Sequence, residues 1–345
     1  MIRNYCLILI FWLFCSSLSA ALTLREKISS LLVLGVSNPS VSDVKVQQVL
    51  NESVGGVFFV GSKFSPDSMR AYVQYLQKNT ELPFIIAIDQ EGGRVQRLKE
   101  APFIRPAAAD LARRSSVMKI YHEAHRVGEA LQKIGVNMLL GPCVDVAEPK
   151  DLGVIGDRSF SSNPMAVSKY AFAVFKAYDA LNLISVPKHF PGHGITLQDS
   201  HYSLPFIPSA SMKRFYCDLY PFSVLSQLNV PVIMVGHLMI EFLDRDFPAS
   251  LSSPLIEDVL KQQLGFKGIV MSDDLSMGAL KKWSLAQRCL LALKAGCDVL
   301  LLQASPSQLK DCLDFLETAV KEGRLSEKQL DASYQRLQRL RQTFL

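Results

Sequence analysis

The stretch PFIIAID, residues 83–89, is an apolar run of strand length that ends on a carboxylate. It lacks the polar alternation of a half-exposed strand, which is typical of a parallel strand buried on both faces. Further runs of the same kind occur at 31–36, 56–61, 137–146, 183–189, 230–237, 268–273 and 298–303. The sequence therefore predicts eight buried strands.

Longer segments with apolar residues at helical spacing lie between these runs, among them 65–80, 107–134, 164–181 and 277–295. Eight strands alternating with helices predict an α/β chain folded as a single (β/α)8 TIM barrel over residues 22–345, with two closing helices in 307–345. The alternative is a doubly wound open sheet. That fold predicts a glycine-rich phosphate turn after the first strand, and Gly35-Val36-Ser37-Asn38 is not such a turn.

The composition limits the classes of function. Of the 345 residues, 49% are hydrophobic and 20% are charged, which favours a large core and argues against disorder. The net charge is +5, but the basic residues are scattered and no basic run is interleaved with aromatic residues. We therefore expect no nucleic-acid partner.

Residues 1–21 have the layout of a signal peptide: Arg3, an apolar run over 5–14, and small residues up to Ala20 and Ala21. The apolar run is too short for a comfortable membrane span. We expect a periplasmic or otherwise exported protein with no stable membrane partner, and a cytoplasmic one if the segment is not functional. Five cysteines remain beyond this segment, with neither disulfide-framework nor metal-site spacing, and are interpreted as core residues: Cys143, Cys217, Cys289, Cys297 and Cys312.

Ionisable residues end five consecutive predicted strands: Asp89, Asp145, Lys188 with His189, His237 and Asp273. Polar residues mark the ends of many strands, so one such residue carries little information. Five in succession favour one shared site, because the carboxyl ends of barrel strands meet at the same mouth.

The segment KHFPGHG, residues 188–194, places His189 and His193 four positions apart. Pro191 and the glycines forbid the helix that would bring both rings to one face, and the glutamate of a zinc-hydrolase motif is missing. We therefore expect no metal, and hydrogen bonding to a polyol instead.

Two pairs of ionisable residues suggest acid–base and covalent chemistry. Asp199 beside His201 would favour the charged imidazole and supply a proton donor near neutral pH, although a solvated loop explains this pair equally well. Asp273 and Asp274 are adjacent strand residues, so one should face the site while the other caps the next helix. A lone inward carboxylate with a nearby acid suggests covalent catalysis at an acetal carbon.

Four motifs resemble the signatures of glycoside hydrolase family 3, in particular its bacterial β-N-acetylhexosaminidases: AIDQEGGRVQR at 87–97, KHFPGHG at 188–194, DSH at 199–201 and SDDLSM at 272–277. The resemblance runs from about residue 24 to residue 345, with the motifs in the family's order and spacing. The family is a (β/α)8 barrel, in agreement with the eight runs.

The resemblance implies that Asp273 is the nucleophile of a retaining hydrolase, that His201 is the acid/base and that Asp199 orients His201. It implies that the terminal N-acetylglucosamine (GlcNAc) is bound by Asp89, Arg97, Arg158, Lys188 and His189. The implied substrate is a β-linked GlcNAc at a non-reducing end, in a GlcNAc-containing oligosaccharide or muropeptide from peptidoglycan. No cofactor or metal is implied.

Four alternatives stay open at this point. The same residues would serve a phosphorylase, and the same fold a β-glucosidase. A non-catalytic sugar-binding barrel would bind without turnover. A hydrolase using the substrate's own acetamido group would employ Asp273 and Asp274 as its paired carboxylates. The apolar N-terminus also differs from the cytoplasmic members of this subgroup.

Overall fold

The computed structural model describes residues 22–40, 42, 44–61, 65–80, 83–148, 153–196 and 198–345. The predicted signal peptide lies outside the described residues. Within the described ranges, no helix combines the length and the apolar character needed to cross a membrane.

All eight predicted runs contain a strand, and the strands are buried. They are β1 (Leu32–Val36), β2 (Gly56–Phe59), β3 (Ile85–Ile88), β6 (Met138–Leu139), β7 (Ile184–Ser185), β9 (Val232–Val235), β11 (Ile269–Ser272) and β12 (Leu300–Leu302). Their apolar side chains form the core of the molecule. The eight-strand prediction is confirmed, although each strand is shorter than its apolar run.

The strands pair in parallel, as predicted, but they do not form one continuous closed sheet. Six of them form a sheet in the order β12-β1-β2-β3-β6-β7, and β9 pairs with β11 in a second sheet. Single parallel bridges join the two sheets, between Phe190 and Val235 and between Met271 and Val299. The observed fold is therefore an α/β domain with a mostly parallel central sheet.

Local chemistry explains both interruptions. Beyond β7, contact with β9 is reduced to a few hydrogen bonds. The Pro187 carbonyl accepts the Met234 amide at 3.0 Å, but Pro187 has no amide hydrogen to donate in return, and the next bond is from the Phe190 amide to the Met234 carbonyl at 2.8 Å. Beside β12, the Asp298 carboxylate accepts the Val270 amide at 3.0 Å, a contact that a strand backbone would otherwise make.

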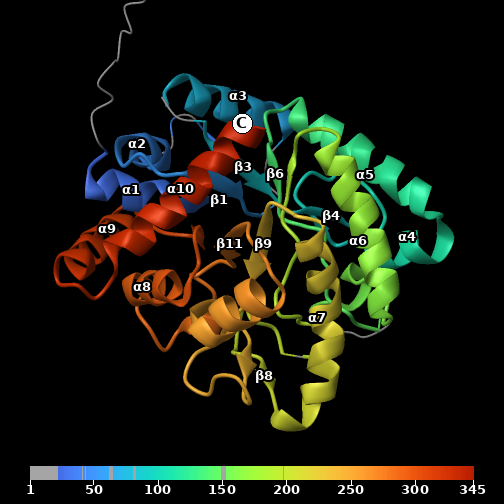
Figure 1. Cartoon of the computed structure of the whole chain (residues 1–345). Coiled ribbons are helices and arrows are strands. Elements are labelled where there is room, and N and C mark those ends of the chain that lie inside the picture. Colours follow the sequence, from blue (N-terminus) through green and yellow to red (C-terminus); the bar gives the residue numbers. More distant parts are fainter. Residues whose placement is uncertain are drawn as a thin grey trace, which may run out of the picture.

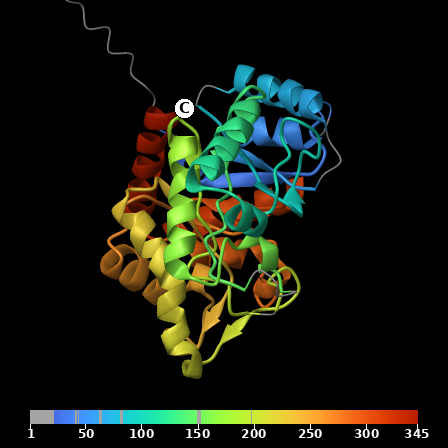
Figure 2. The ribbon, with the colours of Figure 1, turned by 90° about the vertical axis from the view of Figure 1, so that its right-hand side faces the viewer.

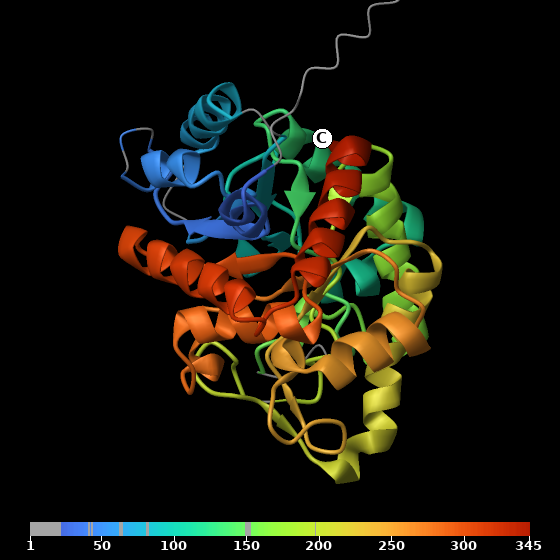
Figure 3. The same ribbon diagram turned by 60° about the vertical axis from the view of Figure 1, so that its left-hand side comes forward.

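Helices surround the strands (Figure 1). They are α1 (Leu24–Ser30), α2 (Val44–Asn51), α3 (Pro66–Lys78), α4 (Ala108–Arg114), α5 (Val117–Gln132), α6 (Pro164–Asp179), α7 (Met212–Gln227), α8 (Leu285–Ala295), α9 (Pro306–Lys321) and α10 (Glu327–Phe344), with a π-helix at Pro254–Gln263. Figure 2 shows α6 and α7 along one side, and Figure 3 shows α9 and α10 packed beside α1. The two predicted closing helices are α9 and α10.

Two helix predictions need correction. The segment 107–134 forms two helices, α4 and α5, because Ser115 and Ser116 are extended and Ser116 caps the second helix by accepting the Lys119 amide. The segment 277–295 is helical over its last part only: a 3-10 turn occupies Gly278–Leu280, and α8 begins after Ser284.

Candidate active site

A cavity of about 570 Å³ lies at the carboxyl ends of the strands. Residues that follow β1, β2, β3, β11 and β12 line it, together with the loop that carries His201. Five of the predicted site residues line this one cavity: Asp89, Arg97, Lys188, His201 and Asp273.

Arg97 is folded back onto Asp89 by a short hairpin. After β3 the chain forms β4 (Gln90–Gly92) and β5 (Val95–Gln96), which pair antiparallel. The buried Gln90 amide fixes the return, because its oxygen accepts the Arg97 amide at 2.9 Å while its nitrogen donates to the Leu98 carbonyl at 2.8 Å. Arg97 Nη2 thereby lies 2.6 Å from Asp89 Oδ2.

Lys188 joins this pair to a second carboxylate. Its Nζ lies 2.5 Å from Asp89 Oδ1 and 2.7 Å from Glu91 Oε1. Burial opposes the ionisation of Asp89, but the charges of Lys188 and Arg97 outweigh it and lower the Asp89 pKa to about 2. Burial likewise opposes the charge on Lys188, yet Asp89 and Glu91 raise its pKa. Asp89 and Lys188 are therefore both charged at neutral pH.

Glu91 connects the cavity to Arg158. Arg158 binds it in a bidentate pair, with Nε 2.9 Å from Oε2 and Nη2 2.8 Å from Oε1. Burial opposes ionisation of Glu91, but Arg158 and Lys188 lower its pKa. Sequence analysis did not single out Glu91, although it lies inside the motif at 87–97. Arg158 does not line the cavity and reaches it through Glu91.

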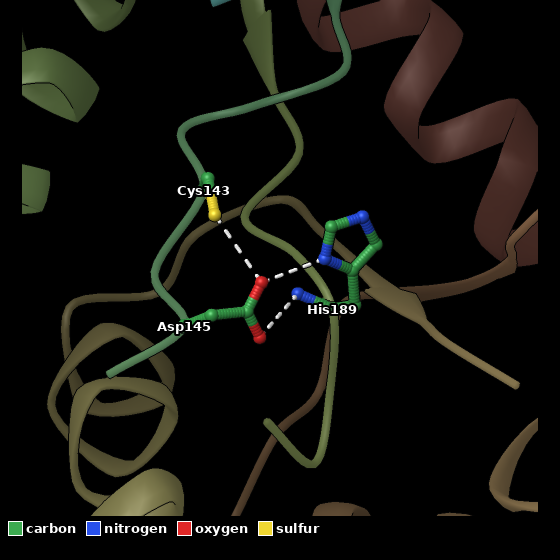
Figure 4. A group of neighbouring side chains, drawn as sticks. All are labelled: Cys143, Asp145 and His189. Carbon is green, nitrogen blue, oxygen red and sulfur yellow. Dashed lines mark hydrogen bonds and ion pairs between the residues drawn. The ribbon is translucent and has the colours of Figure 1, made fainter. Parts of the chain in front are cut away.

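Asp145 holds His189 in a buried cluster with Cys143 (Figure 4). Its carboxylate lies 2.7 Å from His189 Nδ1 and accepts the Cys143 thiol at 3.2 Å and the His193 amide at 2.6 Å. A proton on Nδ1 leaves Nε2 as an acceptor, and Nε2 lies 3.4 Å from Arg158 Nη2. His189 therefore lies behind the cavity, in contact with the Arg158 and Glu91 pair.

The ligand atoms of Cys143, Asp145 and His189 lie within 4.8 Å of one another, close enough for a metal site. In this structure the three residues form a hydrogen-bonded cluster, because the Cys143 thiol and His189 Nδ1 both contact Asp145 Oδ2. Burial and the Asp145 charge raise the Cys143 pKa well above its ordinary value, which keeps the proton that the thiol donates. Metal-free function stays a prediction. Cys143 is buried, as the sequence predicts, and it also donates to Asp145. Cys289, Cys297 and Cys312 are buried as well, but Cys217 is exposed on α7, so the prediction of a core residue is wrong there.

The three histidines of the 188–201 region have separate partners. His193 is buried, its Nδ1 lies 2.6 Å from Thr196 Oγ1, and burial lowers its pKa to about 4. His189 pairs with Asp145, and His201 lies on an exposed loop. They do not converge on one point.

Asp273 ends β11 and faces the cavity. Its amide donates to the Val235 carbonyl, and its carboxylate accepts the Asp274 amide at 2.8 Å. Burial opposes ionisation, but the electrostatic influence of His237, His189 and other neighbours lowers the Asp273 pKa. A carboxylate that is half-buried, anionic and lightly hydrogen-bonded suits nucleophilic attack.

Asp274 has a different role from its neighbour. Its Oδ1 accepts both the amide and the hydroxyl of Ser276, at 2.9 and 2.6 Å, and its Oδ2 accepts the Gln303 amide group at 2.7 Å. The prediction that one of the two aspartates caps the next helix is wrong, because Ser284 caps α8. Asp274 instead stabilises the turn after β11 and ties it to the end of β12.

His237 is buried behind the aspartates and does not line the cavity. Its Nδ1 lies 2.7 Å from Ser250 Oγ and its Nε2 lies 2.9 Å from the Asp274 carbonyl. Burial lowers its pKa, so the ring is neutral at pH 7. It supports the turn that carries Asp273.

His201 reaches the same cavity from a loop. Its Nδ1 lies 2.7 Å from Asp199 Oδ1, which also accepts the His201 amide at 2.9 Å. Burial raises the Asp199 pKa, but these two bonds outweigh burial and lower it overall. The His201 side chain is 62% exposed, and the Gly278 amide donates to the His201 carbonyl at 3.1 Å. The loop is thus attached to the segment after β11.

Comparisons with known proteins agree with this geometry. The model of the glycosyl hydrolase family 3 N-terminal domain matches residues 23–340. A β-hexosaminidase from Alkalilimnicola ehrlichii is 33% identical over 293 residues, covering 83% of this chain and 84% of that protein. The β-hexosaminidase LpqI from Mycobacterium tuberculosis is 32% identical over 330 residues, covering 93% of this chain and 84% of that protein.

Solved structures show the same likeness. A family 3 β-N-acetylglucosaminidase from Paenibacillus sp. superposes with a TM-score of 0.87 at 31% identity, covering 94% of this chain and 63% of that chain. The chain therefore spans slightly less than two thirds of that protein. The structure of M. tuberculosis LpqI gives a TM-score of 0.85 at 32% identity, covering 93% and 94%. The chain belongs to glycosyl hydrolase family 3 and is a glycoside hydrolase, which confirms the resemblance in its sequence.

Proposed function

We propose that the chain is a β-N-acetylhexosaminidase that removes a terminal β-linked GlcNAc from the non-reducing end of its substrate with retention of configuration. The observation that carries this proposal is the joint position of Asp273 and His201 on one cavity at the strand ends. The names of the relatives, β-hexosaminidase and β-N-acetylglucosaminidase, support the identity of the sugar.

In the first step Asp273 attacks the anomeric carbon while His201 gives its Nε2 proton to the leaving oxygen. The products are a glycosyl ester on Asp273 and the free leaving group. In the second step neutral His201 takes a proton from water, the water attacks the anomeric carbon, and the Asp273 carboxylate is released. Asp199 holds the Nδ1 side of the ring, so Nε2 is the atom left to exchange the proton.

The sugar-binding role falls to the ion-paired cluster beside Asp273. Asp89, Arg97 and Lys188 line the cavity and offer fixed charged acceptors and donors for sugar hydroxyl groups. Arg158 and His189 hold this layer from behind through Glu91 and Asp145. Because ion pairs hold these largely buried side chains in place, their geometry is set before substrate binds.

The proposal includes a (β/α)8 barrel, an exported location and a peptidoglycan-derived substrate. The strand order and the two bridging pairs at its gaps support the barrel. The composition of residues 1–21 supports export, and an exported enzyme would meet wall fragments in the periplasm.

The test is release of nitrophenol from β-GlcNAc and β-glucose derivatives, side by side, with and without phosphate. We expect turnover of the GlcNAc derivative and GlcNAc as product. Preference for the glucose derivative would reassign the enzyme as a β-glucosidase, and formation of GlcNAc-1-phosphate would make it a phosphorylase. A 2-fluoro sugar trapped on Asp273 would exclude the acetamido mechanism, and its absence would count against the nucleophile.

A further inference from the structure

We propose that Tyr202 is a stacking platform for the leaving-group sugar, so that it sets a preference for carbohydrate leaving groups. The inference rests on the proposed function, since it takes His201 as the proton donor. Tyr202 follows His201 directly, and its ring centroid lies 6.5 Å from that of His201 at an interplanar angle of 52°.

Tyr202 is exposed although it lies beside the candidate active site. Its exposed fraction is 79%, the highest among the exposed large hydrophobic residues of the described ranges. Tyr202 is not among the residues that line the cavity, but it directly follows His201, which does. Its apolar ring is therefore available to the part of a ligand that extends beyond the cavity.

The backbone beneath the ring is anchored to the cavity wall. The Tyr202 amide donates to the Asp199 carbonyl at 3.0 Å. Gly278, which lines the cavity, lies so close that an added Cβ would stand 2.6 Å from the His201 carbonyl oxygen and 3.3 Å from Tyr202 Cα. Only a residue without a side chain allows this approach. The platform and the proton donor therefore lie on one anchored loop.

The position of the proton donor places the leaving group on the Tyr202 side of the cavity. The acid must lie beside the glycosidic oxygen, and beyond that oxygen comes the leaving group. The Asp89, Arg97 and Lys188 cluster offers charges suited to sugar hydroxyls, whereas Tyr202 offers an apolar face suited to the C–H face of a pyranose and a hydroxyl that can bind its rim. The two surfaces fit the two halves of a disaccharide.

The experiment compares two substrates with the same terminal GlcNAc. One is the disaccharide GlcNAc-β-1,4-GlcNAc, and the other is GlcNAc β-fluoride, whose leaving group has no ring. For Tyr202→Ala we expect kcat/KM to fall about five- to tenfold on the disaccharide and to stay unchanged on the fluoride. Tyr202→Phe should retain most of the disaccharide activity. Equal losses on both substrates, or no loss, would overturn the platform.

The matched control is Tyr216→Ala. Tyr216 is 61% exposed on α7, its ring packs against Phe215, and neither it nor its sequence neighbours line the cavity. We expect it to change neither rate, and a loss on the disaccharide equal to that of Tyr202→Ala would refute a specific platform.

A binding measurement separates this inference from the proposed function. In an Asp273→Ala background, calorimetry with the intact disaccharide should show affinity about five- to tenfold weaker when Tyr202→Ala is added. If the wild type turns over neither substrate but this loss is seen, the proposed function fails and the platform stands. If turnover is seen and the affinity is unchanged, the platform fails and the function stands.

Discussion

Replacing Asp218 by asparagine should stabilise the protein at alkaline pH. Asp218 lies on α7 with its side chain 1% exposed, and its Oδ1 is 3.2 Å from Arg214 Nε. Its Oδ2 is buried without a hydrogen-bond partner. Burial raises the Asp218 pKa to about 7; Arg214 opposes the rise and the Asp145 charge adds to it.

The sign follows from the direction of this shift. The ordinary pKa of the group is 3.8, so the folded state binds the proton more tightly than the unfolded state. The stabilising contribution is complete below about pH 4 and is lost as the pH rises to about 7. A difference of about three pKa units corresponds to about 4 kcal/mol of unfolding free energy.

Asparagine has the same shape and no charge, so it removes this dependence. At pH 5 we expect the unfolding free energies of Asp218→Asn and wild type to agree within about 2 kcal/mol. This pH lies only about 1.2 pH units above the ordinary pKa of 3.8, so most of the destabilisation by the charged carboxylate has not yet developed. At pH 8.5 the variant should be more stable by up to about 4 kcal/mol.

The measurement is urea unfolding at both pH values, followed by tryptophan fluorescence. Asp246→Asn is the control, since Asp246 is exposed and its removal should leave the pH dependence unchanged. If the wild type and Asp218→Asn lose stability equally between pH 5 and pH 8.5, the Asp218 carboxyl is not the group that titrates and the reasoning is wrong.

Further predictions concern catalysis and buried charges. Asp273→Ala should nearly abolish turnover, whereas His201→Ala should slow natural disaccharides far more than aryl glycosides with good leaving groups; equal losses in a rate assay would count against His201 as the acid. Glu91→Gln should lower the unfolding free energy by about 3–5 kcal/mol, measured by denaturant titration, because Arg158 loses its charged partner. Arg341→Met should leave stability unchanged or raise it by about 1–3 kcal/mol in the same titration, since the buried guanidinium leaves Nε and Nη1 unpartnered, and a clear loss would contradict this.

The strands could be predicted because a strand that is buried on both faces consists of an uninterrupted run of apolar residues. A continuous apolar run such as 83–89 needs no knowledge of its neighbours. The length of each strand does depend on neighbours. The run 183–189 yields a strand of two residues, because its partner is irregular beyond Leu139. The Val186 amide is shared between the Leu139 and Gly141 carbonyls, and pairing continues only as a single bridge between Cys143 and Lys188.

Site residues could be predicted from the sequence only where they stand at the end of a predicted strand, because that place in the chain also fixes their place in the fold. Strand ends meet at one edge of a parallel sheet, so Asp89, Lys188 and Asp273 could be grouped from sequence. Glu91 was missed because its partner Arg158 is 67 residues away, and an acidic residue looks the same in a sequence whether it is solvated or paired. His237 also ends a strand but lies behind the site, since its ring contacts Ser250.

The charges of the site are balanced as a group rather than pair by pair. Lys188, Arg97 and Arg158 are three cations joined through Asp89 and Glu91, which leaves one positive charge over. Asp273 supplies the matching negative charge, and Lys188 is among the groups that lower its pKa. If Asp273 becomes a glycosyl ester, that charge disappears and the cluster keeps its excess. An anionic acceptor is then favoured electrostatically. We therefore expect any acceleration by phosphate to weaken as ionic strength rises, and a salt-independent effect would contradict this.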